Sequence, residues 1–161
     1  MENGRLCKWS EEMFAQKLYR FSNKLYTSGN VRAAKLAQNI NNQLNNSYIP
    51  CSAKIGKNSK FAYGAIGIVI HDRAVIGDNV TIGQNTTIGG NNKSKGVPII
   101  KNNVYISCGA RIIGDITVGN NVIIGANSVV IRDVPDNSIV AGVPAKVISS
   151  NIKRFKDLGW I

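Results

Sequence analysis

Residues 70–89 read IHDRAVIGDNVTIGQNTTIG, and this stretch decides the fold. An aliphatic residue recurs at every sixth position, at Ile70, Ile76, Ile82 and Ile88. A helix cannot keep a period of six on one face, and a single strand has a period of two. A sixfold period therefore predicts short strands separated by regular corners and stacked as a solenoid.

The same period extends in both directions along the chain. A second aliphatic run is in phase with the first, since Ile100 follows Ile88 by two sixes, and it comprises Ile100, Ile106, Ile112, Val118, Ile124 and Val130. Upstream, Ile49, Ile55 and Phe61 keep the period with an offset of three residues. Gly, Asn and Asp gather between the aliphatic positions, where tight corners require backbone angles that these residues tolerate.

Two segments break the period. Phe61 and Ile70 are nine residues apart instead of six. Residues 89–99 have the length of two hexads but carry no inward aliphatic residue at position 94. We predict that 89–99 form a basic excursion loop, and long loops on rigid scaffolds often carry function. The alternative is a tolerated insertion without a role.

Residues 10–45 have the pattern of two helices. Ser10 is a candidate N-cap, Gly29 ends the first helix, and Asn30 caps the second. The apolar stripes comprise Phe14, Leu18, Phe21 and Leu25, then Ala33, Leu36, Ala37, Ile40 and Leu44. We interpret the pair as a helical hairpin that covers one end of the main domain, in preference to a membrane or partner-binding segment. The predicted organisation is helical residues 1–48, a solenoid over 49–148 and a tail over 149–161.

Composition excludes several classes of protein. The net charge is +11, but residues 1–60 hold ten basic and three acidic residues, so the excess is local. The chain shows no basic–aromatic stripe, so nucleic acid is not an expected partner. No apolar stretch approaches the ~20 residues that span a bilayer, and the polar start shows no signal peptide. Three cysteines without a CxxC pair suggest reduced thiols in a cytoplasmic protein.

The repeat resembles the hexapeptide acyltransferases. Its 49–148 span is similar to serine acetyltransferases and to related sugar and capsule O-acetyltransferases. Three stretches carry the match: Gly67–Ile70 through Ala74–Gly77, Thr87–Gly90, and Val134–Asn137 through Gly142–Val147. The resemblance implies a mainly β fold, a left-handed parallel β-helix of hexapeptide repeats with a small N-terminal helical segment. It also implies a homotrimer with active sites between subunits.

The resemblance further implies acetyl-CoA as co-substrate. By residue-to-residue match, the expected cofactor contacts are Gly89, Gly90, Cys108, Gly125, Ala126 and Lys146. Small side chains would admit the flexible thiol arm of CoA, and a lysine would meet its phosphates. No metal is expected, because one histidine cannot supply the ligand set of the metal-dependent hexapeptide carbonic anhydrases.

The chain departs from the family at the catalytic positions. The family's principal histidine matches Tyr63, its supporting aspartate matches Tyr48, and a second histidine matches Val97. The general base is then His71, the only histidine of the chain, or Tyr63 contributes. Histidine is the side-chain type whose ordinary pKa suits this task near neutral pH. A third reading is a hexapeptide-repeat trimer that keeps the fold without turnover.

The acceptor expected from the sequence is a sugar hydroxyl of a surface polysaccharide or its precursor. Tyr48 could stack on a sugar ring, and Lys93 and Lys95 could attract an anionic polymer. The family's carboxylate-binding arginine matches Gly96, and the N-terminal part is shorter than the helical domain of biosynthetic serine acetyltransferases. The alternative acceptor is L-serine, which would make the chain a serine O-acetyltransferase of cysteine biosynthesis.

Overall fold

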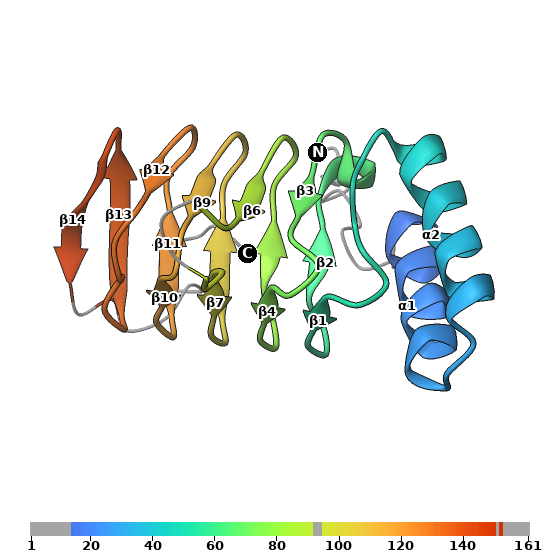
Figure 1. The fold of residues 1–161 in the computed structure, drawn as a ribbon. Coiled ribbons are helices and arrows are strands. Elements are labelled where there is room, and N and C mark those ends of the chain that lie inside the picture. Colours follow the sequence, from blue (N-terminus) through green and yellow to red (C-terminus); the bar gives the residue numbers. More distant parts are fainter. Residues whose placement is uncertain (1–13, 92–94, 151, 153–161) are drawn as a thin grey trace, which may run out of the picture.

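The chain forms a three-sided solenoid in a computed structural model that describes residues 14–91, 95–150 and 152. The predicted cap Ser10 and the predicted substrate residue Lys93 lie outside the described residues. Successive coils stack in one direction from a helical hairpin at one end to β14 at the other (Figure 1). The hairpin consists of α1 (Phe14–Thr27) and α2 (Val31–Asn45).

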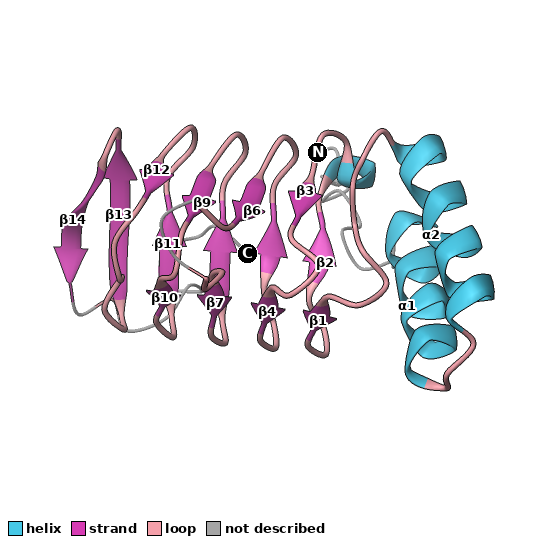
Figure 2. Ribbon diagram, viewed as in Figure 1, coloured by secondary structure: helices cyan, strands magenta, loops and turns pink. Residues whose placement is uncertain are grey.

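Each face of the solenoid is one sheet, and neighbouring strands are parallel except for the last pair (Figure 2). Sheet 1 contains β1 (Lys54–Ile55), β4 (Val75–Ile76), β7 (Ile99–Ile100) and β10 (Thr117–Val118). Sheet 2 contains β2 (Lys60–Phe61), β5 (Thr81–Ile82), β8 (Val104–Ile106), β11 (Val122–Ile124), β13 (Ser138–Gly142) and the antiparallel β14 (Ala145–Ser150). Sheet 3 contains β3 (Val69–Ile70), β6 (Thr87–Gly89), β9 (Arg111–Ile113) and β12 (Val129–Val130).

The strand register shows where the breaks in the period go. In sheet 3, Val69 pairs with Thr87, a step of 18 residues (87 − 69), which is three hexads. Thr87 pairs with Arg111, a step of 24 (111 − 87), so one hexad leaves the coil between β6 and β7. The first coil adds three residues in sheet 1, where Lys54 pairs with Val75. The short 3-10 turn Tyr63–Ala65 lies in this longer connection.

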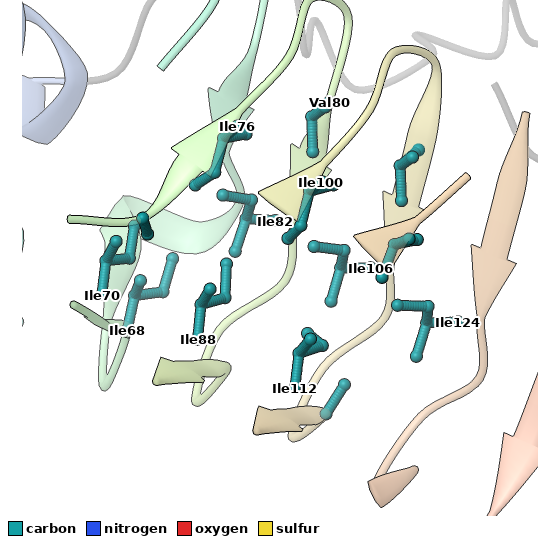
Figure 3. Packing of buried hydrophobic residues seen from close by; sticks show 14 of the residues in the cluster. Ile68, Ile70, Ile76, Val80, Ile82, Ile88, Ile100, Ile106, Ile112 and Ile124 are labelled. Carbon is teal, nitrogen blue, oxygen red and sulfur yellow. The ribbon is translucent and has the colours of Figure 1, made fainter. Parts of the chain in front are cut away.

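The interior is a ladder of the predicted aliphatic side chains (Figure 3). Ile70, Ile82, Ile88, Ile106 and Ile112 have no exposed surface. Burying one such side chain stabilises the fold by about 1.5–3 kcal/mol. The sixfold period is therefore the inward-facing position of every short strand, as the sequence predicts.

Asparagine stabilises the corners between the sheets. Asn58, Asn79 and Asn103 all have a positive φ near 56°, which asparagine adopts at lower cost than most residues. Their side chains also bond from coil to coil, from Asn58 Nδ2 to Asn79 Oδ1 at 3.3 Å and from Asn79 Nδ2 to Asn103 Oδ1 at 3.1 Å. The corner that joins sheets 1 and 2 thus carries its own ladder of amides.

The helical hairpin covers the first coil through polar contacts. The first coil would otherwise present unpaired backbone groups, which are costly to bury. The Tyr19 hydroxyl donates to the Ala53 carbonyl at 2.7 Å, and Arg20 donates to the carbonyls of Ile55 and Gly56 at 2.6 Å each. In the opposite sense, Gln38 Oε1 accepts from the Cys51 backbone N–H at 2.9 Å.

The apolar stripes of the hairpin have the orientation opposite to that of an ordinary amphipathic helix. Phe14 and Phe21 are 58% and 56% exposed, and Leu36 and Leu44 are both 64% exposed. The side chains buried from α1 are Ala15, Gln16, Tyr19 and Ser22. The requirement for hydrogen-bond donors at the first coil decides which face of α1 turns inward. In the part of the chain that the structure describes, no helix is both long and apolar enough to cross a membrane.

We predict that replacement of Tyr19 by phenylalanine lowers the free energy of unfolding by about 1 kcal/mol near neutral pH, the usual net value of one hydrogen bond. Burial is the main cause that raises the Tyr19 pKa from 10.0 to about 12. The folded chain therefore keeps this phenol protonated where the unfolded chain ionises it, and the stabilisation is lost as the pH rises from 10 towards 12.

Denaturant unfolding of wild type and Tyr19→Phe at several pH values measures both effects. The difference in unfolding free energy should shrink above pH 10. Tyr26→Phe is the matched control, because Tyr26 lies on the same helix and is 38% exposed. Equal behaviour of the two variants would contradict this account of the cap.

Candidate functional site

The predicted site residues lie along two edges of sheet 3. The chain enters sheet 3 from sheet 2 at the edge that carries Cys108, and it leaves for sheet 1 at the edge that carries His71. We call these the Cys108 edge and the His71 edge. One strand of two or three residues separates them in every coil.

A cavity of about 370 Å³ opens at the His71 edge. It is lined by Tyr48, Val69, Ile70, His71, Asp72, Thr87, Ile88 and Gly89. The backbone holds Tyr48 beside the strand that precedes His71, because Tyr48 N–H donates to the Ile68 carbonyl at 2.7 Å and Ile70 N–H donates to the Tyr48 carbonyl at 2.9 Å. Three residues singled out from the sequence, Tyr48, His71 and Gly89, therefore share one cavity.

His71 is paired with a carboxylate that the sequence analysis missed. Its Nδ1 lies 2.7 Å from Oδ1 of Asp72, and the two side chains are 32% and 59% exposed. The backbone N–H of Arg73 also lies 3.2 Å from the same Nδ1. The signal in the sequence was the acidic residue next to the only histidine.

Gly89 and Gly90 form the floor at the start of the excursion loop. A side-chain carbon at Gly90 would lie 3.9 Å from Cδ2 of His71 and 3.4 Å from the Gly96 carbonyl oxygen. A side chain at Gly96 is blocked, since its first carbon would lie 1.9 Å from Cγ of Asp115. The loop end is thus drawn close to the His71 edge. Lys95 is exposed and does not line the cavity there.

The other predicted cofactor residues gather at the Cys108 edge. Cys108 and Ala126 are exposed and stacked in successive coils, with Asn127 N–H donating to the Cys108 carbonyl at 2.9 Å. A side chain at Gly125 would meet Cβ of Ala141 at 2.9 Å, so this position stays small. Lys146 pairs with Ala141 on the neighbouring strand and is exposed. Small side chains with a flanking lysine suit a flexible arm that ends in phosphates.

Tyr63 also belongs to the Cys108 edge. Its φ is +50°, and its side chain is 55% exposed. Burial raises the pKa of Tyr105, and the neighbouring Tyr63 and Cys108 side chains add to that rise, which places the three groups together. Tyr63 does not line the His71 cavity. Within one chain, the two residues considered as the base therefore lie on different edges of sheet 3.

Comparison with known proteins identifies relatives of the whole solenoid. Residues 98–132 match the family described as bacterial transferase hexapeptide (six repeats). The chain is 38% identical over 140 residues to serine acetyltransferase of Bacillus subtilis (strain 168), covering 86% of this chain and 64% of that protein. It is 39% identical over 149 residues to serine acetyltransferase of Staphylococcus epidermidis (strain ATCC 12228), covering 91% of this chain and 66% of that protein.

Solved structures agree. A serine acetyltransferase in complex with CoA superposes with a TM-score of 0.75 at 36% identity, covering 83% of this chain and 55% of that one. Serine acetyltransferase of Neisseria gonorrhoeae in complex with serine gives 0.77 at 34%, covering 84% and 55%. The chain spans less than two thirds of the length of these relatives. The sequence periodicity, the three parallel sheets and these likenesses confirm the predicted left-handed β-helix, and the chain belongs to the hexapeptide-repeat transferases, in the branch that resembles serine acetyltransferases.

Proposed function

We propose that this chain is an acetyl-CoA-dependent O-acetyltransferase whose general base is His71, held in place by Asp72. The observation that carries the proposal is the 2.7 Å contact between His71 Nδ1 and Asp72 Oδ1, beside Gly89 and the loop end. A base oriented by a carboxylate is a recurring arrangement for removing a proton from a hydroxyl nucleophile.

The protonation of His71 follows from its two neighbours. The contact with Asp72 requires a proton on Nδ1, whereas acceptance from the Arg73 N–H at 3.2 Å requires a lone pair there. A hydrogen bond to a carboxylate is the shorter and stronger of the two. Nδ1–H therefore donates to Asp72, and Nε2 keeps the lone pair that a base needs.

The chemistry then balances without a metal. The Nε2 lone pair takes the proton of the acceptor hydroxyl as that oxygen attacks the thioester carbonyl carbon. The tetrahedral intermediate collapses, the carbon–sulfur bond breaks, and the imidazolium returns its proton to the leaving CoA thiolate. The products are an acetyl ester and free CoA.

We further propose that the site is completed by a neighbouring subunit in a homotrimer. Each chain carries His71 and the proposed CoA row of Cys108, Gly125 and Ala126 on opposite edges of sheet 3. Threefold packing of such prisms sets the His71 edge of one chain against the Cys108 edge of the next. Exposed apolar side chains on the outer faces support such packing: Val69, Val75 and Ile99 are 43%, 36% and 45% exposed.

L-serine is the acceptor that the relatives' names support, ahead of the sugar hydroxyl expected from the sequence. The sugar remains the second candidate because of specific residues. Tyr48 stands where the family carries an acidic residue, and at Gly96 Asp115 leaves no space for the arginine that would meet a carboxylate. Both acceptors therefore enter the assay of free thiol release from acetyl-CoA.

We predict that His71→Ala lowers acetyl transfer by about a hundred- to ten-thousand-fold, the usual effect of losing a general base. CoA should bind the variant as it binds wild type, because His71 does not belong to the Cys108 edge. The measurement is thiol release with the better of the two acceptors. Arg73→Ala is the matched control at an exposed neighbouring position, and unchanged turnover in His71→Ala would transfer the role to Tyr63.

We predict that Ala126→Trp prevents CoA binding measured by calorimetry. The indole would fill the exposed small-residue row beside Cys108 that we assign to the thiol arm. Ile131→Trp provides a control, because Ile131 is 49% exposed and lies outside that row. Wild-type affinity in Ala126→Trp would show that CoA binds elsewhere.

We predict that the neutral His71 ring carries its proton on Nδ1. The chain contains one histidine, so nitrogen-detected NMR gives a single imidazole to assign. Asp72→Asn should shift the proton towards Nε2, because the carboxylate that selects the tautomer is lost. An Nε2-protonated ring in wild type would contradict the proposed base.

A further inference from the structure

A second hollow adjoins the His71 cavity on the side of the helical hairpin. Its volume is about 490 Å³, and it is lined by Asn39, Asn42, Gln43, Asn46, Ser47, Tyr48 and Val69. Tyr48 and Val69 also line the His71 cavity, so the two spaces meet at these residues. A group bound in the hollow would therefore lie beside the proposed base.

Four amide side chains of α2 and its C-cap form one wall. Asn39, Asn42, Gln43 and Asn46 are spaced at i, i+3, i+4 and i+7, which places them on one helix face. The apolar side chains Leu36, Ile40 and Leu44 occupy a different, exposed face of the same helix. The amides are thus segregated towards the hollow and are not scattered over the helix.

The hollow offers unused hydrogen-bonding groups. Asn39 and Gln43 make no side-chain hydrogen bond to any residue that the structure describes. Asn42 uses its Oδ1 to accept from the Ile49 N–H at 3.1 Å. Ser47 Oγ is buried and has no partner within residues 14–91, 95–150 and 152, a state that costs free energy until a partner is bound.

The chemistry of this wall selects a neutral ligand. An amide both donates and accepts, as a hydroxyl does, and it carries no charge. No Asp, Glu, Lys, Arg or His side chain lines the hollow. A charged ligand group would lose water there without gaining an opposite charge. Tyr48 is 49% exposed and offers a flat apolar ring with a polar tip at the junction of the two spaces.

We propose that this hollow is an acceptor subsite for a neutral polyhydroxylated group, such as a sugar ring, that presents one hydroxyl to His71. The inference rests on the proposed acetyl-transfer function and concerns the acceptor of that same site. L-serine fits this wall poorly, because its carboxylate would have no cationic partner in either space except the base itself. Of the two acceptors considered above, the hollow thus favours the sugar.

The test measures binding separately from turnover. Ligand-observed NMR compares neutral methyl glycosides, the corresponding uronic acids and L-serine on the full chain. The variants are the double substitution Asn39→Ala with Gln43→Ala, His71→Ala, and Leu44→Ala. Leu44 is the matched control, since it is adjacent to Gln43, is 64% exposed and does not line the hollow.

We expect at least one neutral glycoside to bind wild type, His71→Ala and Leu44→Ala with equal affinity. The double variant should bind it about tenfold more weakly, as the loss of two ordinary hydrogen bonds implies. Unchanged affinity in the double variant, tighter binding of serine or uronic acid, or no binding of any glycoside would overturn the subsite.

Failure of the proposed enzyme function gives a different result. Glycoside binding that depends on Asn39 and Gln43, without thiol release from acetyl-CoA, would support the subsite and contradict acetyl transfer. Thiol release with L-serine, without glycoside binding, would support acetyl transfer and contradict the subsite.

Discussion

The stacking of inward aliphatic side chains is the constraint on which the rest of this structure depends. Ile70, Ile88 and Ile112 contact one another through a dry interior that accepts one side chain per short strand. Because the coil step is then fixed at 18 residues, any additional residue has to leave at a corner. The additional hexad after β6 and the 3-10 turn before β3 both do so. The chemistry of the molecule is consequently found along the edges of the prism.

A stack of coils has open ends, and the hairpin solves this problem with donors and acceptors more than with apolar area. Tyr19, Arg20 and Gln38 reach backbone groups of the first coil, while Phe14 and Leu36 face outward. The same choice of faces turns the amides of α2 towards Tyr48. The cap therefore shapes the space next to the proposed base as well as closing the interior.

The sequence predicts the solenoid well because its signal is a strict period. The orientation of the hairpin was harder, since an apolar stripe usually turns inward and the sequence does not display the unpaired carbonyls of Ala53 and Ile55. The separation of the site residues was accessible by counting. His71 and Gly89 are 18 residues apart, as are Cys108 and Ala126, whereas Gly89 and Cys108 are 19 apart. Residues one full coil apart share an edge, and the other pair does not. Asp72 was overlooked because a corner acid is common in these repeats.

The separation of base and cofactor row within one chain leads to the central claim, that each site is assembled from two subunits. The most direct measurement mixes His71→Ala and Ala126→Trp chains, each inactive alone, under conditions that exchange subunits. Shared sites would pair an intact His71 with an intact Ala126 from the neighbour, and an equal mixture should regain about a quarter of wild-type thiol release. Mixtures that stay as inactive as either variant alone would contradict a site shared between subunits.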